Sequence, residues 1–208
     1  MPVILFQGDS ITDVGRNRGV ASENSAAALG GGYPLLAASG ILRSHPDGGL
    51  RVFNRGVSGD RVPSLQARWV TDTIALKPDI LSILVGVNDL WHKLMGNSNG
   101  TVADYESQYN ALLDATKAAL PEVRLVVLEP FVLVTGAVDA RWFPEFDERR
   151  AVAARVATRA GAAFIPLQAM FTQLAQSAPP SYWLADGVHP TIAGHAAIAE
   201  RWRDAVGL

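Results

Sequence analysis

The sequence contains no cysteine, and this absence removes several chemistries at once. Disulfide bonds, thiol nucleophiles and cysteine-based metal sites all require that side chain. The chain also lacks an excess of basic residues, because 18 Lys and Arg stand against 20 Asp and Glu in 208 residues. Nucleic acids and anionic membranes bind to a concentrated positive field. We therefore expect neither a nucleic acid nor a membrane as a partner.

Long apolar runs are also missing. No run approaches the roughly 20 residues that a membrane-spanning helix needs. The amino-terminal run 3–6 is too short and too poor in basic residues for a signal peptide. This predicts a cytoplasmic protein, unless a leader has been removed from the chain. The run 30–32 is three glycines, but it lacks the Lys-Ser/Thr ending of a P-loop, so no cofactor is predicted.

What the chain does contain is the composition of a globular protein. Hydrophobic residues make up 49% and charged residues 18%, which separates it from disordered chains. No internal repeat, low-complexity tract or linker divides the sequence. The length is enough to bury a core without disulfides or metals. We therefore expect one domain that spans residues 1–208.

Short apolar segments alternate with segments of helical spacing. The expected strands are 3–6, 50–53, 79–85, 124–128 and 162–165. The expected helices are 33–44, 63–76, 101–120, 145–161, 168–177 and 193–206. A Gly-, Asn-, Ser- and Ala-rich connection covers 13–32, with room for a helical turn. Such alternation predicts the α/β class, with a parallel sheet and helices on both of its faces.

Polar, glycine-flanked clusters follow the first three strands and precede the last helix. They are Gly8-Asp9-Ser10, Gly56-Val57-Ser58-Gly59-Asp60, Gly86-Val87-Asn88-Asp89 and Asp186-Gly187-Val188-His189-Pro190. In a parallel sheet, ligands and catalytic groups collect beyond the carboxyl ends of the strands. We expect the four clusters to meet at one edge of the sheet.

These clusters contain the parts needed for acyl transfer by a serine. The reaction requires a hydroxyl nucleophile, an imidazole base, a carboxylate that orients it and donors for the oxyanion. Ser10 can supply the hydroxyl, His189 the base and Asp186 the carboxylate. The candidate oxyanion donors are the backbone N–H groups of Ser10 and Gly59 and the amide of Asn88.

Simpler interpretations exist for these residues. By itself, Ser10 after a strand is typical of a helix N-cap. Ser58 is a rival nucleophile, but it lacks the Gly-x-Ser-x-Gly pattern of a nucleophile elbow, which favours a turn residue. A metal site built from Asp186, His189 and His195 has no recognisable ligand motif and would leave Ser10 unexplained. No metal is predicted.

Taken together and in this order, the four clusters resemble the signature blocks of the SGNH hydrolases, also called the GDSL esterase/lipase family. Ile11 stands where the family name has Leu. The resemblance spans nearly the whole chain. It implies a three-layer α/β/α sandwich with a five-stranded parallel sheet. It also implies a Ser10-His189-Asp186 triad with Ser10, Gly59 and Asn88 as the oxyanion hole.

Longer strings look most like the branch that contains acetylxylan esterases and related carbohydrate deacetylases. These strings are 6–13 and 86–91, together with the segment 32–33. The residues expected near a substrate are Asp9, Tyr33, Trp91 and Trp183. Asp9 has a second interpretation as a buried brace for its turn, and the two tryptophans as packing residues.

The function expected from the residues and the resemblance is a serine esterase that removes short acyl groups, acetyl above all, from a carbohydrate. Its partner is a small acylated substrate such as an acetylated saccharide, and a homo-oligomer is left open. One alternative keeps the machinery for alkyl esters, lipids or thioesters. Another is a catalytically silent carbohydrate-binding protein, and the sheet pattern alone would also suit a flavodoxin-like nucleotide binder.

Overall fold

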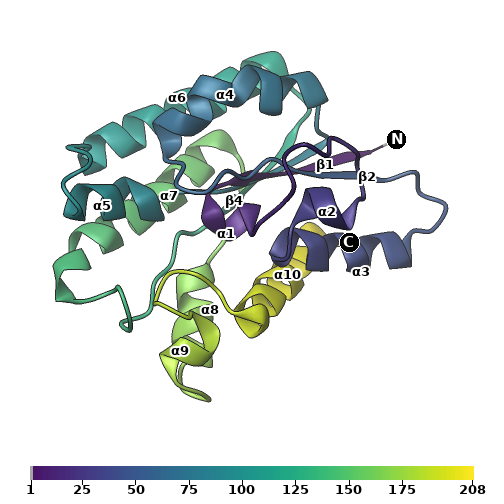
Figure 1. Ribbon diagram of the computed structural model, residues 1–208. Coiled ribbons are helices and arrows are strands. Elements are labelled where there is room, and N and C mark those ends of the chain that lie inside the picture. Colours follow the sequence, from purple (N-terminus) through teal and green to yellow (C-terminus); the bar gives the residue numbers. More distant parts are fainter. Residues whose placement is uncertain (1) are drawn as a thin grey trace.

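The computed structural model describes residues 2–208, and its centre is a single parallel sheet (Figure 1). The strands are β1 (Val3–Gly8), β2 (Arg51–Asn54), β3 (Ile80–Leu84), β4 (Arg124–Leu128) and β5 (Ala163–Ile165). Neighbouring strands are parallel and follow the order β2-β1-β3-β4-β5. The predicted α/β sandwich with five parallel strands is confirmed.

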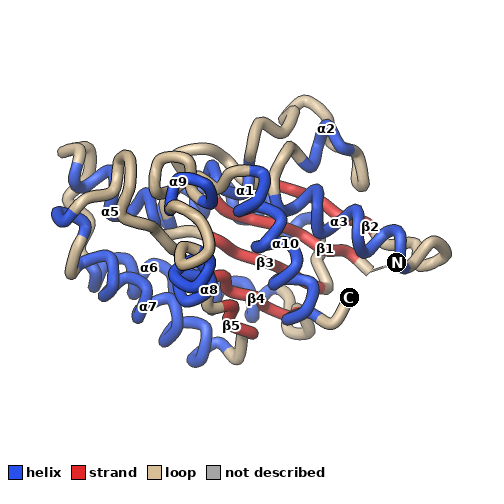
Figure 2. Tube along the Cα trace, turned by 90° about the horizontal axis from the view of Figure 1, so that it is seen from below, coloured by secondary structure: helices blue, strands red, loops and turns tan. Residues whose placement is uncertain are grey.

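Helices cover both faces of the sheet because alternate side chains of each strand point to opposite faces. Ile4 and Phe6 of β1 belong to one buried cluster, whereas Val3 and Leu5 belong to the other. The first face is covered by α3 (Tyr33–Ser44), α8 (Leu167–Leu174) and α10 (Ile192–Val206), and the second by α4 (Val62–Asp72), α6 (Val102–Ala119) and α7 (Glu145–Ala160). Figure 2 shows the sheet in red between these blue layers.

The structure also contains several short helices and 3₁₀ turns. They are α1 (Ser10–Asp13), α2 (Ala26–Leu29), α5 (Val87–Leu94), α9 (Pro180–Trp183) and the 3₁₀ turns η1 (Ile74–Leu76) and η2 (Ala140–Trp142). The expected connection 13–32 therefore contains a helix. Among residues 2–208, no helix has both the length and the apolar character needed to cross a bilayer.

The helix expected over 63–76 is divided in two, and that prediction was wrong at its carboxyl end. Gln7 of β1 is fully buried, and its amide donates to Asp72 O at 3.1 Å and to Thr73 Oγ1 at 2.8 Å. These bonds hold the end of α4 at Asp72, and η1 begins after Thr73. A buried side chain 65 residues away thus ends the helix.

The strand order changes direction at β1. The chain leaves β1 for β2 on one side and then returns to place β3 on the other side. In open parallel sheets, the carboxyl ends on either side of such a switch point border a crevice where ligands bind. The ends of β1 and β3 carry the clusters at Ser10 and Asn88, so the fold brings two of the four clusters to this point.

Candidate active site

A sharp turn at the end of β1 positions Ser10. Gly8 has φ +155°, and an added Cβ would lie 2.2 Å from Leu84 O, so a side chain has no room there. The Asp9 carboxylate then accepts a hydrogen bond from Ile11 N at 3.0 Å and caps α1. Ser10 is the first residue of this helix rather than its cap. Because α1 begins at Ser10, the Ser10 N–H is one of the amino-terminal N–H groups that have no partner within the helix.

Ser10, His189 and Asp186 form a hydrogen-bonded chain. Ser10 Oγ lies 2.9 Å from His189 Nε2, and His189 Nδ1 lies 2.8 Å from Asp186 Oδ2. The other carboxylate oxygen of Asp186 accepts from Val188 N at 2.9 Å and from His189 N at 2.8 Å. This is the arrangement in which an imidazole can accept a serine proton while a carboxylate orients the ring.

The hydrogen bonds to Asp186 also determine its charge. Partial burial works to raise the pKa of Asp186, but the bonds from the backbone and ring of His189 and from Val188 N outweigh it and lower the pKa below 3.8. The carboxylate is therefore ionised at neutral pH. Its negative charge faces the ring nitrogen that is turned away from Ser10, which is the place of the orienting carboxylate in a serine triad.

The loop that carries Asp186 and His189 is held by a neighbouring segment after β4. Leu133 N donates to Gly187 O at 2.9 Å, and Ala137 N donates to Asp186 O at 2.8 Å. An added Cβ on Gly187 would lie 2.6 Å from Leu133 O, so the two segments touch backbone to backbone. The position of the loop therefore depends on the segment 130–138.

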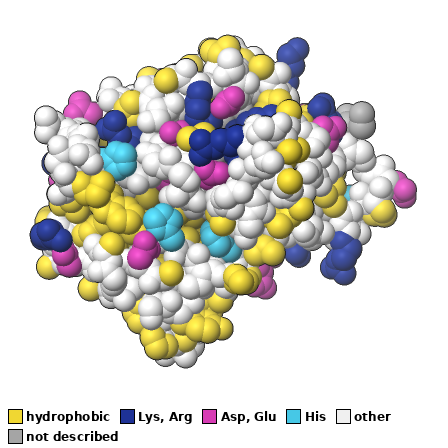
Figure 3. Space-filling model, in the orientation of Figure 1, with side chains coloured by type: hydrophobic (Ala, Val, Ile, Leu, Met, Phe, Trp, Pro, Cys, Tyr) yellow, Lys and Arg dark blue, Asp and Glu magenta, His cyan; other side chains and the backbone are white. Residues whose placement is uncertain are grey.

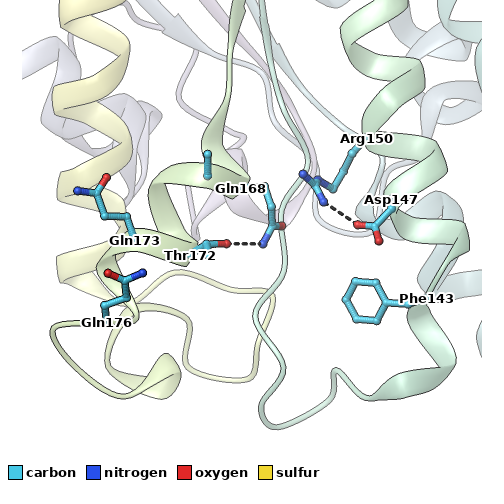
Figure 4. A pocket seen from close by; sticks show the side chains of 8 residues that line it. Phe143, Asp147, Arg150, Gln168, Thr172, Gln173 and Gln176 are labelled. Carbon is cyan, nitrogen blue, oxygen red and sulfur yellow. Dashed lines mark hydrogen bonds and ion pairs between the residues drawn. The ribbon is translucent and has the colours of Figure 1, made fainter.

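That segment is anchored in turn from a polar groove between α7 and α8 (Figure 4). The groove is lined by Phe143, Asp147, Arg150, Gln168, Ala169, Thr172, Gln173 and Gln176. The amide of Gln168 accepts from Val132 N at 3.0 Å and donates to Val132 O at 2.9 Å. The lining includes neither Ser10 nor His189. The groove is linked to the site through the bonds from Gln168 to the segment 130–138.

Three hydrogen-bond donors are candidates for contact with an ester carbonyl oxygen. The backbone N–H groups of Ser10 and Gly59 have no acceptor within residues 2–208, and Gly59 lies exposed at φ +85°. Asn88 is buried, and its NH₂ donates to Asp60 O at 3.1 Å, which leaves its second hydrogen free. The donors come from the ends of β1, β2 and β3. Their role as an oxyanion hole stays a prediction.

Two residues expected near a substrate are buried instead, and for these the expectation needs correction. Asp9 is 1% exposed and faces Ile11 N, so it braces the turn, which was its second interpretation. Tyr33 is 0% exposed, and its hydroxyl lies 3.0 Å from Thr12 Oγ1. Neither side chain reaches the surface where a substrate would bind.

The two tryptophans differ. The Trp91 ring is half-buried, and its centroid lies 5.8 Å from that of the His189 ring and 5.6 Å from that of Trp142. Trp183 packs edge-on against Tyr182 at 5.0 Å, and it makes no ring contact with His189 in the part of the chain described. The structure thus brings Trp91 to the Ser10-His189 pair, and contact of either ring with a substrate stays a prediction.

Helix α5 is the element of the site that the sequence interpretation missed. Asn88 and Trp91 lie three residues apart on it and so share one face. The signal was present, because Val87, Leu90, Trp91 and Leu94 have the i, i+3, i+4, i+7 spacing of an apolar helix face. The polar residues Asn88 and Asp89 after β3 were interpreted as part of a turn instead.

Buried acids lie beneath the crevice. Burial, with the charges of Asp89 and Asp60 nearby, raises the pKa of Asp9 to about 7. Burial likewise raises the pKa of Asp89 to about 6, although the charge of Arg149 opposes this. One carboxylate oxygen of Asp9 and one of Asp89 have no hydrogen-bond partner within residues 2–208. Asp9 and Asp89 therefore keep their protons to a higher pH than exposed aspartates do.

His195 of α10 packs against Tyr33. Its Nδ1 accepts from Tyr33 N at 3.2 Å, and the two rings stack at 6.5 Å. Burial, together with the charge of His189, lowers the pKa of His195 to about 4, so its ring is neutral. Within residues 2–208, no group of three or more metal-binding side chains forms a candidate site.

The surface around the site is open. The side chains of His189 and Asp186 are 40% and 38% exposed. Figure 3 shows histidine side chains beside a gathering of hydrophobic side chains on the face that Figure 1 presents. Exposed hydrophobic side chains on α5 and the segment after it include Leu94 and Met95. The His189 and Asp186 side chains are therefore accessible from solvent.

Comparison with known proteins identifies the family. Residues 6–197 match the GDSL-like lipase/acylhydrolase family. An acetylxylan esterase of Geobacillus stearothermophilus is 34% identical over 209 residues, which cover 99% of this chain and 94% of the relative. The crystal structure of an acetylxylan esterase from that organism has a TM-score of 0.87 at 32% identity and covers 100% of this chain and 94% of its own.

A protein of Parabacteroides merdae ATCC 43184, provisionally assigned as a GDSL-like lipase, has a TM-score of 0.96 at 43% identity and covers 99% of this chain and 95% of its own. Family, fold and near-complete coverage agree, and the resemblance inferred from the four motifs is confirmed. The chain belongs to the GDSL-like lipase/acylhydrolase family and is a carboxylic ester hydrolase.

Proposed function

We propose that this hydrolase is a serine esterase that removes short acyl groups, acetyl in particular, from an acylated saccharide. The observation that supports the proposal most is the hydrogen-bonded chain Ser10-His189-Asp186, with links of 2.9 and 2.8 Å. Two structures of the Geobacillus relative, each with a serine or a histidine replaced by alanine, are described as catalytic mutants. A serine and a histidine are therefore catalytic in a close relative.

The proposed reaction passes through an acyl-enzyme. Ser10 Oγ attacks the ester carbonyl carbon, and its proton moves to His189 Nε2. The tetrahedral intermediate collapses, the bond to the alcohol oxygen breaks, and His189 gives its proton to that oxygen. Water then loses a proton to His189 and attacks the acyl carbon. The carboxylic acid leaves, and Ser10 regains its proton.

Charge on the carbonyl oxygen develops in both halves of the reaction. The N–H groups of Ser10 and Gly59 and the free amide hydrogen of Asn88 are the proposed donors to it. Their lack of competing acceptors among residues 2–208 supports this role, because donors that are free and fixed before the reaction need no reorganisation.

The alcohol part of the ester lies on the His189 side, because His189 must protonate it. This side carries the exposed edge of the triad and the Trp91 ring, 5.8 Å from the His189 ring. A flat aromatic face suits the apolar face of a pyranose ring. The openness of this side suits a bulky alcohol, and the acetylxylan esterase relatives support a saccharide ester.

Acetate release tests the proposal across a panel of acetylated xylo-oligosaccharides and alkyl esters of increasing acyl length. The native protein should release acetate from the saccharides, and Ser10→Ala should lose at least about 10⁴-fold in kcat. A fluorophosphonate should label Ser10 covalently in the native protein and leave Ser10→Ala unlabelled. Turnover retained by Ser10→Ala would sink the mechanism.

The same panel tests the substrate class. A preference for long acyl chains or for thioesters would overturn the deacetylase assignment and leave the serine mechanism in place. The family description includes lipases, so acyl length is the feature that separates the two activities.

A further inference from the structure

Asp13 ties the helix that carries Ser10 to the turn that carries Gly59. It is the last residue of α1, and its carboxylate is 5% exposed. One of its oxygens, Oδ2, accepts hydrogen bonds from the backbone N–H and from the hydroxyl of Ser58, both at 2.9 Å. Ser58 immediately precedes Gly59. The catalytic mechanism itself makes no use of the Asp13 carboxylate.

Two arginines complete this connection. Arg18 donates to the same Asp13 oxygen at 2.5 Å, and the buried Arg16 donates through Nε to Gly56 O at 2.7 Å. Burial works to raise the pKa of Asp13, but the bonds from Arg18 and Ser58 outweigh it and lower the pKa. The carboxylate therefore stays ionised, and its hydrogen bonds to Ser58 are charge-assisted.

The turn after β2 and helix α1 are in close backbone contact. An added Cβ on Gly56 would lie 2.5 Å from Asp13 N, so the turn after β2 touches the backbone of α1. Beyond Gly59, the turn is held separately, because Asn88 donates to Asp60 O at 3.1 Å and Arg68 donates to Asp60 Oδ2 at 2.8 Å. Asp13 therefore holds the backbone on the amino-terminal side of Gly59, and Asn88 and Arg68 hold Asp60 on the other side.

We propose that Asp13 is a positioning residue that fixes the direction of the Gly59 N–H relative to Ser10, with Ser58 as the residue through which it acts. This inference rests on the proposed serine esterase function. Ser10 and Gly59 stand at the ends of two different strands, and the bond from Asp13 to Ser58 joins those ends into one rigid unit. The Asp13 side chain itself is buried and touches no substrate.

The test compares Asp13→Ala, Asp13→Asn and Ser58→Ala on p-nitrophenyl acetate. Asp13→Ala removes all the bonds and should lower kcat about 10- to 100-fold, somewhat less than the loss of a whole oxyanion donor. Asp13→Asn and Ser58→Ala keep part of the connection and should lose less. KM should change by no more than about 3-fold, because the donor acts on the transition state.

A second measurement separates positioning from general damage. The affinity for a trifluoromethyl ketone, which forms an oxyanion on Ser10, should fall in proportion to kcat/KM along the series. Asp104→Ala is the matched control, since Asp104 also accepts from a backbone N–H and a hydroxyl, those of Thr101 on distant α6. It should leave kcat and inhibitor affinity unchanged.

The outcomes are distinct. Unchanged kcat in Asp13→Ala and Ser58→Ala overturns the inference, as does a lower kcat without a matching loss of inhibitor affinity. Ser58→Ala retains the backbone bond to Asp13, so it keeps the test decisive if Asp13→Ala does not fold. If Ser10→Ala is inactive while the Asp13 and Ser58 variants are fully active, only this inference fails. If Ser10→Ala remains active, the proposed function and the inference fail together.

Discussion

The two sides of the Ser10-His189 pair are built differently. On the side of Ser10, the proposed nucleophile, Asp9 and Asp13 are 1% and 3% exposed, and their carboxyl groups accept hydrogen bonds from backbone N–H groups of α1 and of the Gly59 turn. On the base side, the side chains of His189 and Asp186 are 40% and 38% exposed, on a loop held mainly through its backbone.

This difference follows the chemistry that each side performs. Donors to an oxyanion lower the barrier only if they are fixed before the charge appears. A general base must instead admit an alcohol as it leaves and a water molecule as it enters. A buried brace suits the first task and an open loop suits the second.

The exposed side should nevertheless show the largest effect of a single conservative change. Asp186→Asn should lower kcat on p-nitrophenyl acetate about 10⁴-fold, because the amide favours the wrong tautomer of His189. Asp114→Asn is the control, since Asp114 is an exposed acid on α6 with a side chain 58% exposed. A loss of less than about 10-fold would mean that the exposed loop does not need its carboxylate.

On the buried side, Asn88→Ala should lower kcat about 10²- to 10³-fold with little change in KM. The variant removes a proposed oxyanion donor and also the bond to Asp60 O. Steady-state kinetics measures the effect, and Asn99→Ala, on the exposed segment after α5, is the control. A rise in KM at constant kcat would assign Asn88 to substrate binding instead.

The buried acids should make stability depend on pH. The pKa of Asp9 rises from 3.8 to about 7, so the folded protein keeps a proton that the unfolded chain loses between these values. Stability should fall as pH rises through about 7, by an amount on the order of a few kcal/mol, at about 1.4 kcal/mol per pKa unit. Asp89, with a pKa raised to about 6, acts in the same direction.

Urea unfolding at pH 5 and pH 8 measures this effect. Asp9→Asn should reduce the difference between the two pH values, whereas Asp114→Asn should not, because the pKa of Asp114 is lowered by Arg159 and lies below this range. If the native protein is as stable at pH 8 as at pH 5, folding does not raise the pKa values of these buried acids.

The smallest expected effect belongs to the open side. Trp91→Ala should raise KM for an acetylated xylo-oligosaccharide about 10-fold and leave p-nitrophenyl acetate nearly unaffected, since the small ester has no sugar to stack. Tyr182→Ala, which removes a 56% exposed ring from α9, serves as the control. Equal losses on both substrates would show that Trp91 supports His189 and does not bind the sugar.

The sheet could be predicted from the sequence because each strand is a short apolar run bounded by glycine or polar residues. The predicted bounds of the strands agree with the structure to within one or two residues. The prediction that the strands are parallel is also confirmed. The division of 63–76 could not be predicted, because it depends on Gln7, a residue of β1 that reaches Asp72 and Thr73 only in the folded chain.

The sequence predicted which residues belong to the candidate site, but it did not predict which of them are exposed to solvent. The order of the four motifs pointed to Ser10, His189 and Asp186, and the fold places them in hydrogen-bond contact. Burial is decided by packing from distant elements, so the sequence did not reveal that Asp9 and Tyr33 are covered. A role for Asp13 was not predicted either, because its partner Ser58 lies 45 residues away in the sequence.

Ser10 and His189 are 179 positions apart in the sequence, and this separation has a consequence for the synthesis of the chain. Ser10 leaves the ribosome long before His189, so under the proposed mechanism a growing chain cannot hydrolyse an ester until β5 and the segment that carries His189 have been made. Turnover is therefore a reporter of completed folding. If the chain were cut in the exposed segment after α5, each fragment would lack half of the Ser-His pair, and activity regained on mixing would measure their reassembly.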